Sequence, residues 1–367
     1  MRKAGRDSAV AEKRNTGVYS DLKIFHHTDK IKDIIDGKRT PPIYVRIKPT
    51  NLCNQNCYYC GSKDENVPED RMFDRKAMIP EQKMHEIIED FGDMGVRAVT
   101  FSGGGEPLIY PYIEDAFERV KSKGIDYSII TNGQALEGRK AELLSEAKWI
   151  RVSLESACAE TYSKIRGVQT FDKVIHNIES FVKIKNKNCT AGINCVVTRD
   201  NYREIYDLCK VIAATGADNI KFSPLRLDGD LGEYHKPIEQ TVKEQIQRAK
   251  SDFENNGFVI IDKYDGDAGL EPGYQKPYHR CMIQEIFTVI GADCKVYYCH
   301  QRAYTRGGDI GSLKEKSFKE LWYAEDTVQK IRELDACKEC DFRCVFDERN
   351  ILLNNFLDID HNHINFV

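Results

Sequence analysis

The sequence predicts an α/β protein with a curved or barrel-like parallel sheet, followed by a small cysteine-rich domain. Three observations predict this fold. Runs of β-branched residues alternate six times with segments of helical periodicity, polar residues follow the strand runs directly, and cysteines gather in two groups. Because parallel neighbours need crossover connections, which right-handed helices supply, six strand–helix units in a row favour one parallel sheet.

The first forty residues precede this repeat. Residues 1–16 are charged and lack apolar periodicity, whereas residues 22–37 carry apolar residues at helical spacing and end before Pro41 and Pro42, which predicts one short helix. The expected strands are 43–48, 97–101, 126–131, 149–154, 191–197 and 219–223. The expected helices between them are at about 80–94, 111–123, 138–146, 170–185 and 201–215.

After residue 226 the pattern changes. A charged loop, a long polar helix at about 237–256 and a Gly/Pro/Asp-rich link come first. A hairpin-like stretch (286–299), a helical segment (317–334) and the motif CKECDFRC (337–344) follow. The expected division is an N-terminal extension with a short helix (1–40), a core (41–230), a helix and linker (231–279), a cysteine-rich domain (280–350) and a tail (351–367).

Composition narrows the class of protein. The chain has 54 Lys plus Arg against 58 Asp plus Glu, so it has no general attraction to nucleic acid or to an anionic membrane. It has no apolar run long enough to span a bilayer and no apolar N-terminal stretch that could act as a signal sequence. We therefore expect a cytoplasmic protein. Its 13 cysteines, an odd number in a reducing compartment, indicate metal or iron–sulfur ligation.

The first cysteine group directly follows the first expected strand. The run TNLCNQNCYYC places Cys53, Cys57 and Cys60 in a CxxxCxxC loop at the carboxyl edge of the sheet, where parallel α/β folds form their sites. Soft thiolates at these spacings suit zinc or an iron–sulfur cluster, and a cluster held by three cysteines leaves one iron open. Buried packing cysteines are the alternative, but three in eight residues beside Asn and Gln make a poor core pattern.

This motif, together with the run Gly103-Gly104-Gly105-Glu106-Pro107 at the end of the second strand, resembles the radical S-adenosylmethionine superfamily. The resemblance implies a partial (β/α)6 TIM-like barrel. It also implies that Cys53, Cys57 and Cys60 bind a 4Fe-4S cluster whose open iron is chelated by S-adenosylmethionine. In that family a reducing electron cleaves S-adenosylmethionine to a 5′-deoxyadenosyl radical.

The resemblance also assigns contacts to S-adenosylmethionine. Tyr59 takes the aromatic position against the adenine, and the methionine amino group meets the segment Gly104, Gly105 and Glu106. Contacts to the ribose and carboxylate are expected from the ends of the third and fourth strands, namely Thr131, Asn132, Ser153 and Glu155. Many relatives have Asp where this chain has Glu155. The alternative interpretation of these polar residues is that they cap strand ends.

The second cysteine group lies near the C-terminus and comprises Cys281, Cys299, Cys337, Cys340 and Cys344. It could hold zinc or an iron–sulfur cluster, and a small domain stapled by metal needs little core of its own. The arrangement resembles the auxiliary-cluster domain called SPASM, and more closely its shortened twitch form with one auxiliary 4Fe-4S cluster. Cys281, Cys299, Cys337 and Cys340 fit best as ligands, while Cys344 could replace one of them or belong to a second, incomplete site. We interpret Cys158, Cys189, Cys195 and Cys209 as small hydrophobic core residues.

For the reaction, the resemblance implies hydrogen abstraction from a substrate, with dehydrogenation as a natural outcome if the auxiliary cluster accepts an electron. About 40 residues precede the first strand, which leaves no room for the peptide-recognition domain that many peptide-modifying relatives carry. A small polar substrate, such as a sugar, aminocyclitol or nucleotide-linked sugar, is therefore expected. Flavodoxin or ferredoxin would be the reductant. Modification of a peptide or protein is the alternative.

Arginines after the later strands are candidates for holding an anionic group of the substrate. Arg226 follows the sixth strand and Arg166 lies after the fourth, and Arg binds phosphate or carboxylate through paired hydrogen bonds. Two non-enzyme alternatives stay open: an iron–sulfur electron carrier, or a zinc-stabilised binding module.

Overall fold

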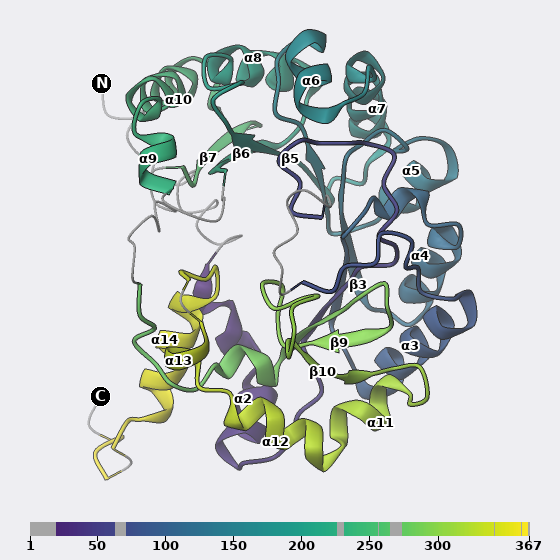
Figure 1. Cartoon of the computed structure of the whole chain (residues 1–367), viewed down its shortest axis with the longest axis vertical. Coiled ribbons are helices and arrows are strands. Elements are labelled where there is room, and N and C mark those ends of the chain that lie inside the picture. The colour runs from purple at the N-terminus through teal and green to yellow at the C-terminus, as the bar shows by residue number, and fades with distance from the viewer. Residues whose placement is uncertain are drawn as a thin grey trace.

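The computed structural model describes residues 20–62, 71–225, 231–255, 257–264, 274–340, 342–360 and 362–365. Its strands are β1 Tyr44–Ile47, β2 Ala98–Phe101, β3 Asp126–Thr131, β4 Trp149–Ser153, β5 Thr190–Val197, β6 Asn219–Pro224, β7 Val259–Asp262, β8 Phe287–Ile290, β9 Lys295–Tyr297 and β10 Asp309–Ser312. They form one sheet in the order β10-β9-β8-β1-β2-β3-β4-β5-β6-β7. The sheet curves around a central axis without closing, so the barrel is partial (Figure 1).

The seven strands β1 to β7 run parallel to one another. The first six confirm the predicted strands. β7 is a seventh that the sequence pattern did not predict, because its apolar run is short and lies between Gly257 and a polar segment. On the other side of β1, β8 also pairs in parallel, with Tyr44 opposite Phe287 and Ile47 opposite Ile290. The cysteine-rich part of the chain therefore shares the sheet of the core.

Helices on the convex face of the sheet connect successive strands (Figure 1). They are α3 Glu81–Met94, α4 Ile113–Ser122, α5 Gly138–Leu144, α6 Ala159–Arg166, α7 Phe171–Ile184 and α8 Ile205–Thr215. α9 Leu231–His235 and α10 Glu239–Phe253 follow, the latter confirming the long polar helix. α6 was not predicted, because its eight residues are mostly polar.

Side chains along each strand point alternately to the outer side of the sheet, where the hydrophobic core lies, and to its inner side. Val45 and Ile47 of β1 are buried in the main hydrophobic cluster, as are Val99 and Phe101 of β2, and helices cover this outer side of the sheet. Side chains alternate across a strand, so the intervening positions face inward. Thr100, one of these positions, hydrogen-bonds Ser128 of β3 across 2.6 Å between hydroxyl oxygens. The inner face is therefore polar.

The C-terminal part carries α11 Phe318–Tyr323, α12 Glu325–Glu333, α13 Ala336–Glu339 and α14 Asp347–Leu357. The single helical segment predicted over 317–334 is divided at Ala324, whose extended backbone (φ −62°, ψ 137°) ends α11 and begins α12. The predicted N-terminal helix is likewise two elements, the 3-10 helix η1 Asp21–His26 and α2 Thr28–Ile35. A second hydrophobic cluster joins these two ends of the chain through residues such as Ile24, Phe287 and Leu353.

The interpretation of Cys158 as a core residue was wrong. Cys189, Cys195 and Cys209 are buried as predicted, but Cys158 is exposed. It immediately precedes α6, where its side chain lies beside Thr161 and Glu204. In the part of the chain that the structure describes, no helix is both long and apolar enough to cross a membrane.

Candidate active site and cysteine groups

The loop that follows β1 carries the first cysteine group and is anchored on the end of α6. The amide of Asn56 donates to the carbonyl of Arg166 (2.9 Å), and the amide of Tyr58 donates to the carbonyl of Ile165 (3.2 Å). The last carbonyls of a helix lack partners within the helix, so they are available to such a loop. Cys53 interacts electrostatically with both Cys57 and Cys60. The structure therefore brings the three predicted thiols together at the carboxyl edge of the sheet.

The Arg166 side chain lies under this loop. Its guanidinium forms an ion pair with Glu155 and donates to Oε1 of Gln55 (3.2 Å) and Sγ of Cys57 (3.5 Å). Arg166 and Glu155 are 5% and 1% exposed, so this ion pair is removed from water. This geometry gives Arg166 a role in holding the cysteine loop, while its contact with substrate stays a prediction.

The glycine run packs directly against the same loop. The amides of Gly105 and Glu106 donate to the carbonyls of Thr50 and Leu52 at 3.1 and 2.8 Å. A Cβ on Gly104 would lie 2.2 Å from Oδ1 of Asn51, and one on Gly105 would lie 1.8 Å from the Leu52 carbonyl oxygen. Only glycine allows so close an approach of two backbone segments. The glycines therefore fix the cysteine loop against the end of β2.

The Glu106 carboxylate joins the ends of β2 and β3. It accepts hydrogen bonds from the Thr131 hydroxyl (2.6 Å), the Asn132 amide (2.7 Å) and the Leu108 amide (3.0 Å). Burial raises the pKa of Glu106, whereas these hydrogen bonds favour its charged form. The Asn132 side chain in turn donates to Oδ1 of Asn54 on the cysteine loop (2.7 Å). The three predicted residues Glu106, Thr131 and Asn132 thus form one polar network, and their contacts to S-adenosylmethionine stay predictions.

Tyr59, Ser153 and Glu155 lie on the other side of the loop. Tyr59 is half-buried beside Glu155 and Arg166, and burial raises its pKa well above the usual value for a tyrosine. Ser153 is half-buried at the carboxyl end of β4, two residues before Glu155. The structure therefore gathers all the predicted contacts to S-adenosylmethionine around the ends of β2, β3 and β4.

The second cysteine group converges from three segments that are distant in sequence. Cys281 interacts electrostatically with Cys299, Cys340 and Cys344. Burial raises the pKa of these thiols, and that of Cys344 reaches about 11. Deprotonation of such thiols is coupled to metal binding. The four electrostatically linked residues include Cys344, which the sequence left in an uncertain role.

The number of thiols in the first group bears on which metal it suits. A structural zinc site takes four ligands, whereas a 4Fe-4S cluster held by three cysteines leaves one iron open to another ligand. The three thiols of Cys53, Cys57 and Cys60 therefore fit an iron–sulfur cluster better than zinc.

A buried polar network supports the second group. The Lys276 ammonium pairs with Asp347 (2.8 Å), which also accepts from the Tyr278 hydroxyl (2.5 Å) and, through its other oxygen, from the Cys344 amide (2.7 Å). Asn350 donates to Sγ of Cys281 (3.5 Å). Such hydrogen bonds orient thiolate ligands and tune the metal group that they hold.

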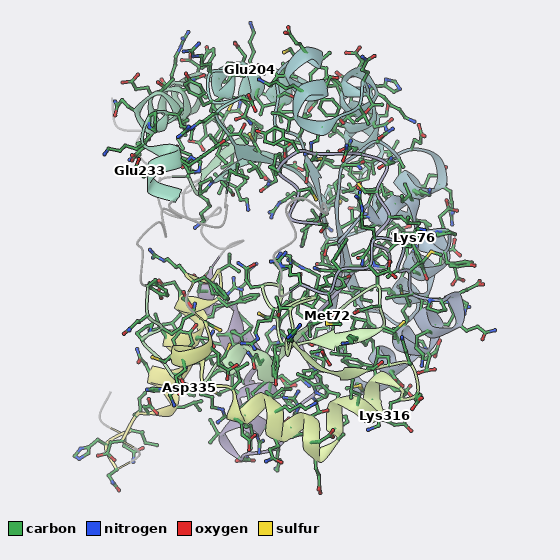
Figure 2. The ribbon with its side chains drawn as sticks, in the orientation of Figure 1. Met72, Lys76, Glu204, Glu233, Lys316 and Asp335 are labelled. Atoms are coloured by element: carbon green, nitrogen blue, oxygen red, sulfur yellow. The ribbon has the colours of Figure 1, made fainter. Side chains whose placement is uncertain are left out.

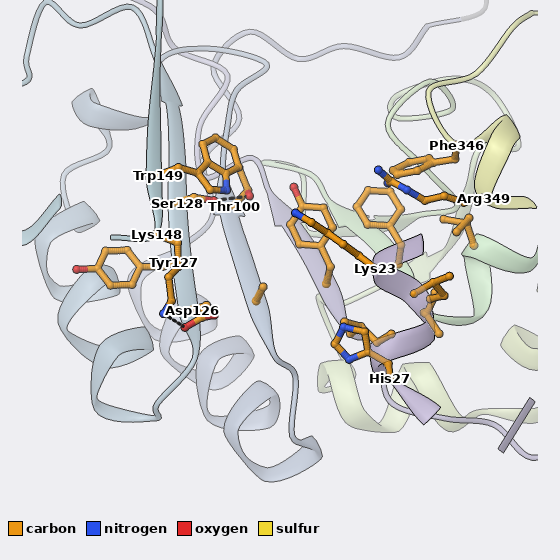
Figure 3. Close-up of a pocket in the computed structure, with 17 residues that line it drawn as sticks. Lys23, His27, Thr100, Asp126, Tyr127, Ser128, Lys148, Trp149, Phe346 and Arg349 are labelled. Atoms are coloured by element: carbon orange, nitrogen blue, oxygen red, sulfur yellow. Dashed lines mark hydrogen bonds and ion pairs between the residues drawn. The ribbon is translucent and has the colours of Figure 1, made fainter. Parts of the chain in front are cut away.

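A cavity lies at the opposite end of the barrel. It has a volume of about 490 Å³ and is lined by the first residues of four strands, Tyr44, Ala98, Asp126 and Trp149, with Phe287 beside them (Figure 3). The cysteine loop follows the carboxyl end of β1. This cavity is therefore separate from the predicted active site.

Sequence reasoning missed several residues near the cysteine groups. Arg46 and Lys48 belong to the inner side of the first strand segment, and Tyr304 contacts Asn51 of the first loop. The alternation of polar residues at 46 and 48, directly before the cysteine motif, was a signal that could have found the first two. The predicted substrate residue Arg226 lies outside the described residues.

Comparison with known proteins identifies the family. The family model described as the radical SAM superfamily matches residues 47–212, and the model described as an iron–sulfur cluster-binding domain, SPASM, matches residues 281–344. The chain belongs to the radical SAM superfamily. Membership makes it an enzyme with 4Fe-4S clusters and S-adenosylmethionine as cofactors. The family, the fold class and the cofactors that we expected from the sequence are therefore confirmed.

Individual relatives extend this result. GTP 3′,8-cyclase of Clostridium perfringens (strain 13 / Type A) is 29% identical over 240 residues, covering 62% of this chain and 72% of the relative. Among solved structures, Streptococcus suis SuiB bound to precursor peptide SuiA has a TM-score of 0.61 at 18% identity, covering 85% of this chain and 71% of that one. The structure of anSMEcpe with bound AdoMet has a TM-score of 0.59 at 18% identity, covering 87% and 100%. These two structural matches show the shared fold.

Proposed function

We propose that this radical SAM enzyme cleaves S-adenosylmethionine reductively and abstracts hydrogen from a small polar molecule. The observation that carries this proposal is the polar inner face of the sheet. This face is continuous with the carboxyl ends of the strands, where the candidate site lies. Arg151 and Ser153 of β4 belong to this face, as do Asn194 of β5 and Ser223 of β6. A hydroxylated or charged substrate would find hydrogen-bonding partners there, whereas an apolar one would leave them unpaired.

Each group of residues has a role in this proposal. When bound, the first cluster supplies the electron that releases a 5′-deoxyadenosyl radical from S-adenosylmethionine. Cys53, Cys57 and Cys60 would hold that cluster, and the glycine run together with the Glu106 network keeps their loop in place. Tyr59 and Ser153 would line the S-adenosylmethionine site.

For the auxiliary cluster we propose Cys281, Cys299, Cys340 and Cys344 as ligands. Their mutual electrostatic interactions support this set. It takes Cys344 in place of Cys337, the fourth ligand that the sequence favoured. An auxiliary cluster at this position could accept an electron from the substrate, which makes a dehydrogenation our preferred outcome.

The similarity to GTP 3′,8-cyclase supports a small molecule over a peptide, because GTP, after which that relative is named, is a nucleotide. The likeness to SuiB concerns the fold alone and adds no argument for a peptide. Reduced flavodoxin or ferredoxin would supply the electron, and the cytoplasm is the compartment in which we expect the enzyme to work.

The test begins with anaerobically reconstituted protein, dithionite and S-adenosylmethionine. We expect the unchanged protein to form 5′-deoxyadenosine and Cys57→Ala to form none. If the unchanged protein forms no 5′-deoxyadenosine although its iron content is full, the proposed chemistry is overturned. Substrate class is tested with deuterated candidates. Deuterium in 5′-deoxyadenosine from a labelled sugar or nucleotide supports the proposal, and transfer from a peptide with none from small molecules would overturn it.

A further inference from the structure

A group of basic side chains lies next to the second cysteine group and faces the first cysteine group. Arg46 and Lys48 are two positions apart on one segment, so both belong to the inner side of the sheet. Arg71 forms a backbone bridge with Thr305, in the loop that follows Cys299. His300 is the next residue after Cys299. The amide of Met72, next to Arg71, donates to the carbonyl of Tyr304 (2.6 Å), and the Lys48 ammonium lies over the ring of the same tyrosine, so these groups meet around the segment that follows Cys299.

The described part of the chain gives these three cations no ion-pair partner. Among the residues that the structure describes, no carboxylate forms an ion pair with Arg46, Lys48 or Arg71. Lys48 is only 6% exposed, and its ammonium lies 4.7 Å from the ring centroid of Tyr304. Nε of Arg46 is buried and has no hydrogen-bond partner. Asp293, the carboxylate that acts on Lys48, accepts a hydrogen bond from the Tyr297 hydroxyl (2.6 Å).

Lys48 is buried, Arg46 and Arg71 are half-buried, and His300 is exposed. A buried cation without a counter-charge is unfavourable unless something pairs with it. Burial, together with the neighbouring charges of Arg46 and Arg71, lowers the pKa of Lys48 to about 7. An anion between these groups would relieve both the desolvation and the mutual repulsion. No ion pair among the described residues relieves the desolvation or the repulsion of these cations. The arrangement therefore has the properties of a binding site for an anionic ligand.

The position of the group relates it to the proposed chemistry. Lys48 directly precedes the segment that leads to Cys53, and His300 adjoins Cys299. Tyr304, which lies under the Lys48 ammonium, donates a hydrogen bond to Asn51 of the first loop. An anion held here would lie between the two cysteine groups, which is where a substrate could meet the radical.

We propose that Arg46, Lys48, Arg71 and His300 bind a phosphoryl group of the substrate, so that the substrate is a phosphorylated small molecule. This inference rests on the proposed function and narrows its substrate class. A phosphoryl group carries up to two negative charges and several acceptor oxygens, which match two guanidinium groups and an ammonium. A single carboxylate would leave most of the positive charge without a partner.

The test measures binding to the reconstituted holoenzyme by calorimetry, with pyrophosphate and inorganic phosphate as probes. Lys48→Gln and Arg46→Gln should each weaken binding about tenfold or more, the effect of losing one charged hydrogen bond. Lys48→Arg, which keeps the charge, should recover part of the affinity. The matched control is Lys76→Gln, because Lys76 is exposed, lies near Arg71 in sequence and is labelled in Figure 2. This control should bind as the unchanged protein does.

Two further arms distinguish the source of the phosphoryl group. GTP is compared with guanosine, and glucose 1-phosphate with glucose. In the pair that resembles the substrate, only the phosphorylated compound should bind more weakly to Lys48→Gln than to the unchanged protein. Iron content and circular dichroism confirm that each variant is folded. Absence of phosphate and pyrophosphate binding, or equal weakening by Lys48→Gln and Lys76→Gln, would overturn the inference. Cleavage of S-adenosylmethionine without substrate is measured in parallel, so a failure of the proposed function is seen separately.

Discussion

The hydroxyl of Tyr304 donates a 2.8 Å hydrogen bond to Oδ1 of Asn51, although the two residues are 253 positions apart in the chain. The same hydroxyl accepts from the amide of Ala292 (3.0 Å). Tyr304 has a φ of 66°, a left-handed conformation that is uncommon for a bulky residue and is found mainly where the surrounding structure enforces it. The loop of the first cysteine group and the segment after Cys299 are therefore held in a fixed relation.

Tyr304→Phe tests this link. The substitution leaves the Asn51 side chain and the Ala292 amide without their partner, which should lower the free energy of unfolding by about 1–3 kcal/mol. Denaturant unfolding measured under anaerobic conditions checks it. Tyr206→Phe is the control, because the Tyr206 hydroxyl bonds Asp252 at the surface. Equal effects of the two substitutions would contradict the prediction.

Gly104→Ala should displace the cysteine loop. The new Cβ would lie 2.2 Å from Oδ1 of Asn51 and 2.6 Å from the Phe73 ring, so Asn51 or its backbone must move. We expect loss of most of the first cluster's iron after reconstitution, with the auxiliary cluster retained, as measured by iron analysis and electron paramagnetic resonance. Gly257→Ala is the control, since its Cβ would meet nothing closer than 3.4 Å. A Gly104→Ala protein with full iron would show that the close approach is unimportant.

Replacing Cys53, Cys57 and Cys60 together by Ala should remove about half of the iron and sulfide, because two 4Fe-4S clusters contribute about eight of each. The triple variant should form no 5′-deoxyadenosine. Replacement of the three buried cysteines Cys189, Cys195 and Cys209 by Ser or Ala provides the comparison and should leave the iron content unchanged. Full iron in the triple variant would mean that the first cluster is not held there.

Cys344→Ala and Cys337→Ala separate the two possible ligand sets of the auxiliary cluster. We expect Cys344→Ala to lose about half of the total iron and Cys337→Ala to keep it, because Cys344 interacts with Cys299 and Cys281. In both variants the first cluster should still cleave S-adenosylmethionine. The opposite pattern, with iron lost only from Cys337→Ala, would restore the set that the sequence favoured.

The ion pair of Glu155 and Arg166 is predicted to be strongly coupled. Removing one member of a buried ion pair leaves the other charge uncompensated, so Arg166→Met and Glu155→Gln should each destabilise the protein by about 3–5 kcal/mol. The double variant should be destabilised by less than the sum of the two. Denaturant unfolding of all four proteins measures this coupling, and strict additivity would argue against it.

Much of the fold could be predicted because its signals are local. Each of the six predicted strands is a β-branched run that leads into a helical segment, and the polar residues at the strand ends mark one edge of the sheet. The sequence after β7 is a Gly/Pro/Asp-rich link instead of a helical segment, and the pairing of β8 with β1 joins segments more than 200 residues apart. Nothing in local periodicity specifies either of them.

The same distinction applies to the candidate site. Three cysteines within eight residues are visible in the sequence, and so is the glycine run. The contact of Arg166 with Cys57 spans 109 positions and depends on where α6 ends. The uncompensated charges of Arg46 and Lys48 also needed the structure, because sequence shows that a residue is basic without showing that acidic partners are missing.

The parallel pairing of β8 with β1 has a consequence for how the two halves of the enzyme can be separated. Without the C-terminal part, β1 would present a row of unpaired backbone amides and carbonyls to solvent, and such a row is a template for aggregation. A fragment that ended before residue 280 would expose the very strand that leads into Cys53. The C-terminal part thus covers the β1 edge of the core sheet, and we expect the two parts to fold as one unit.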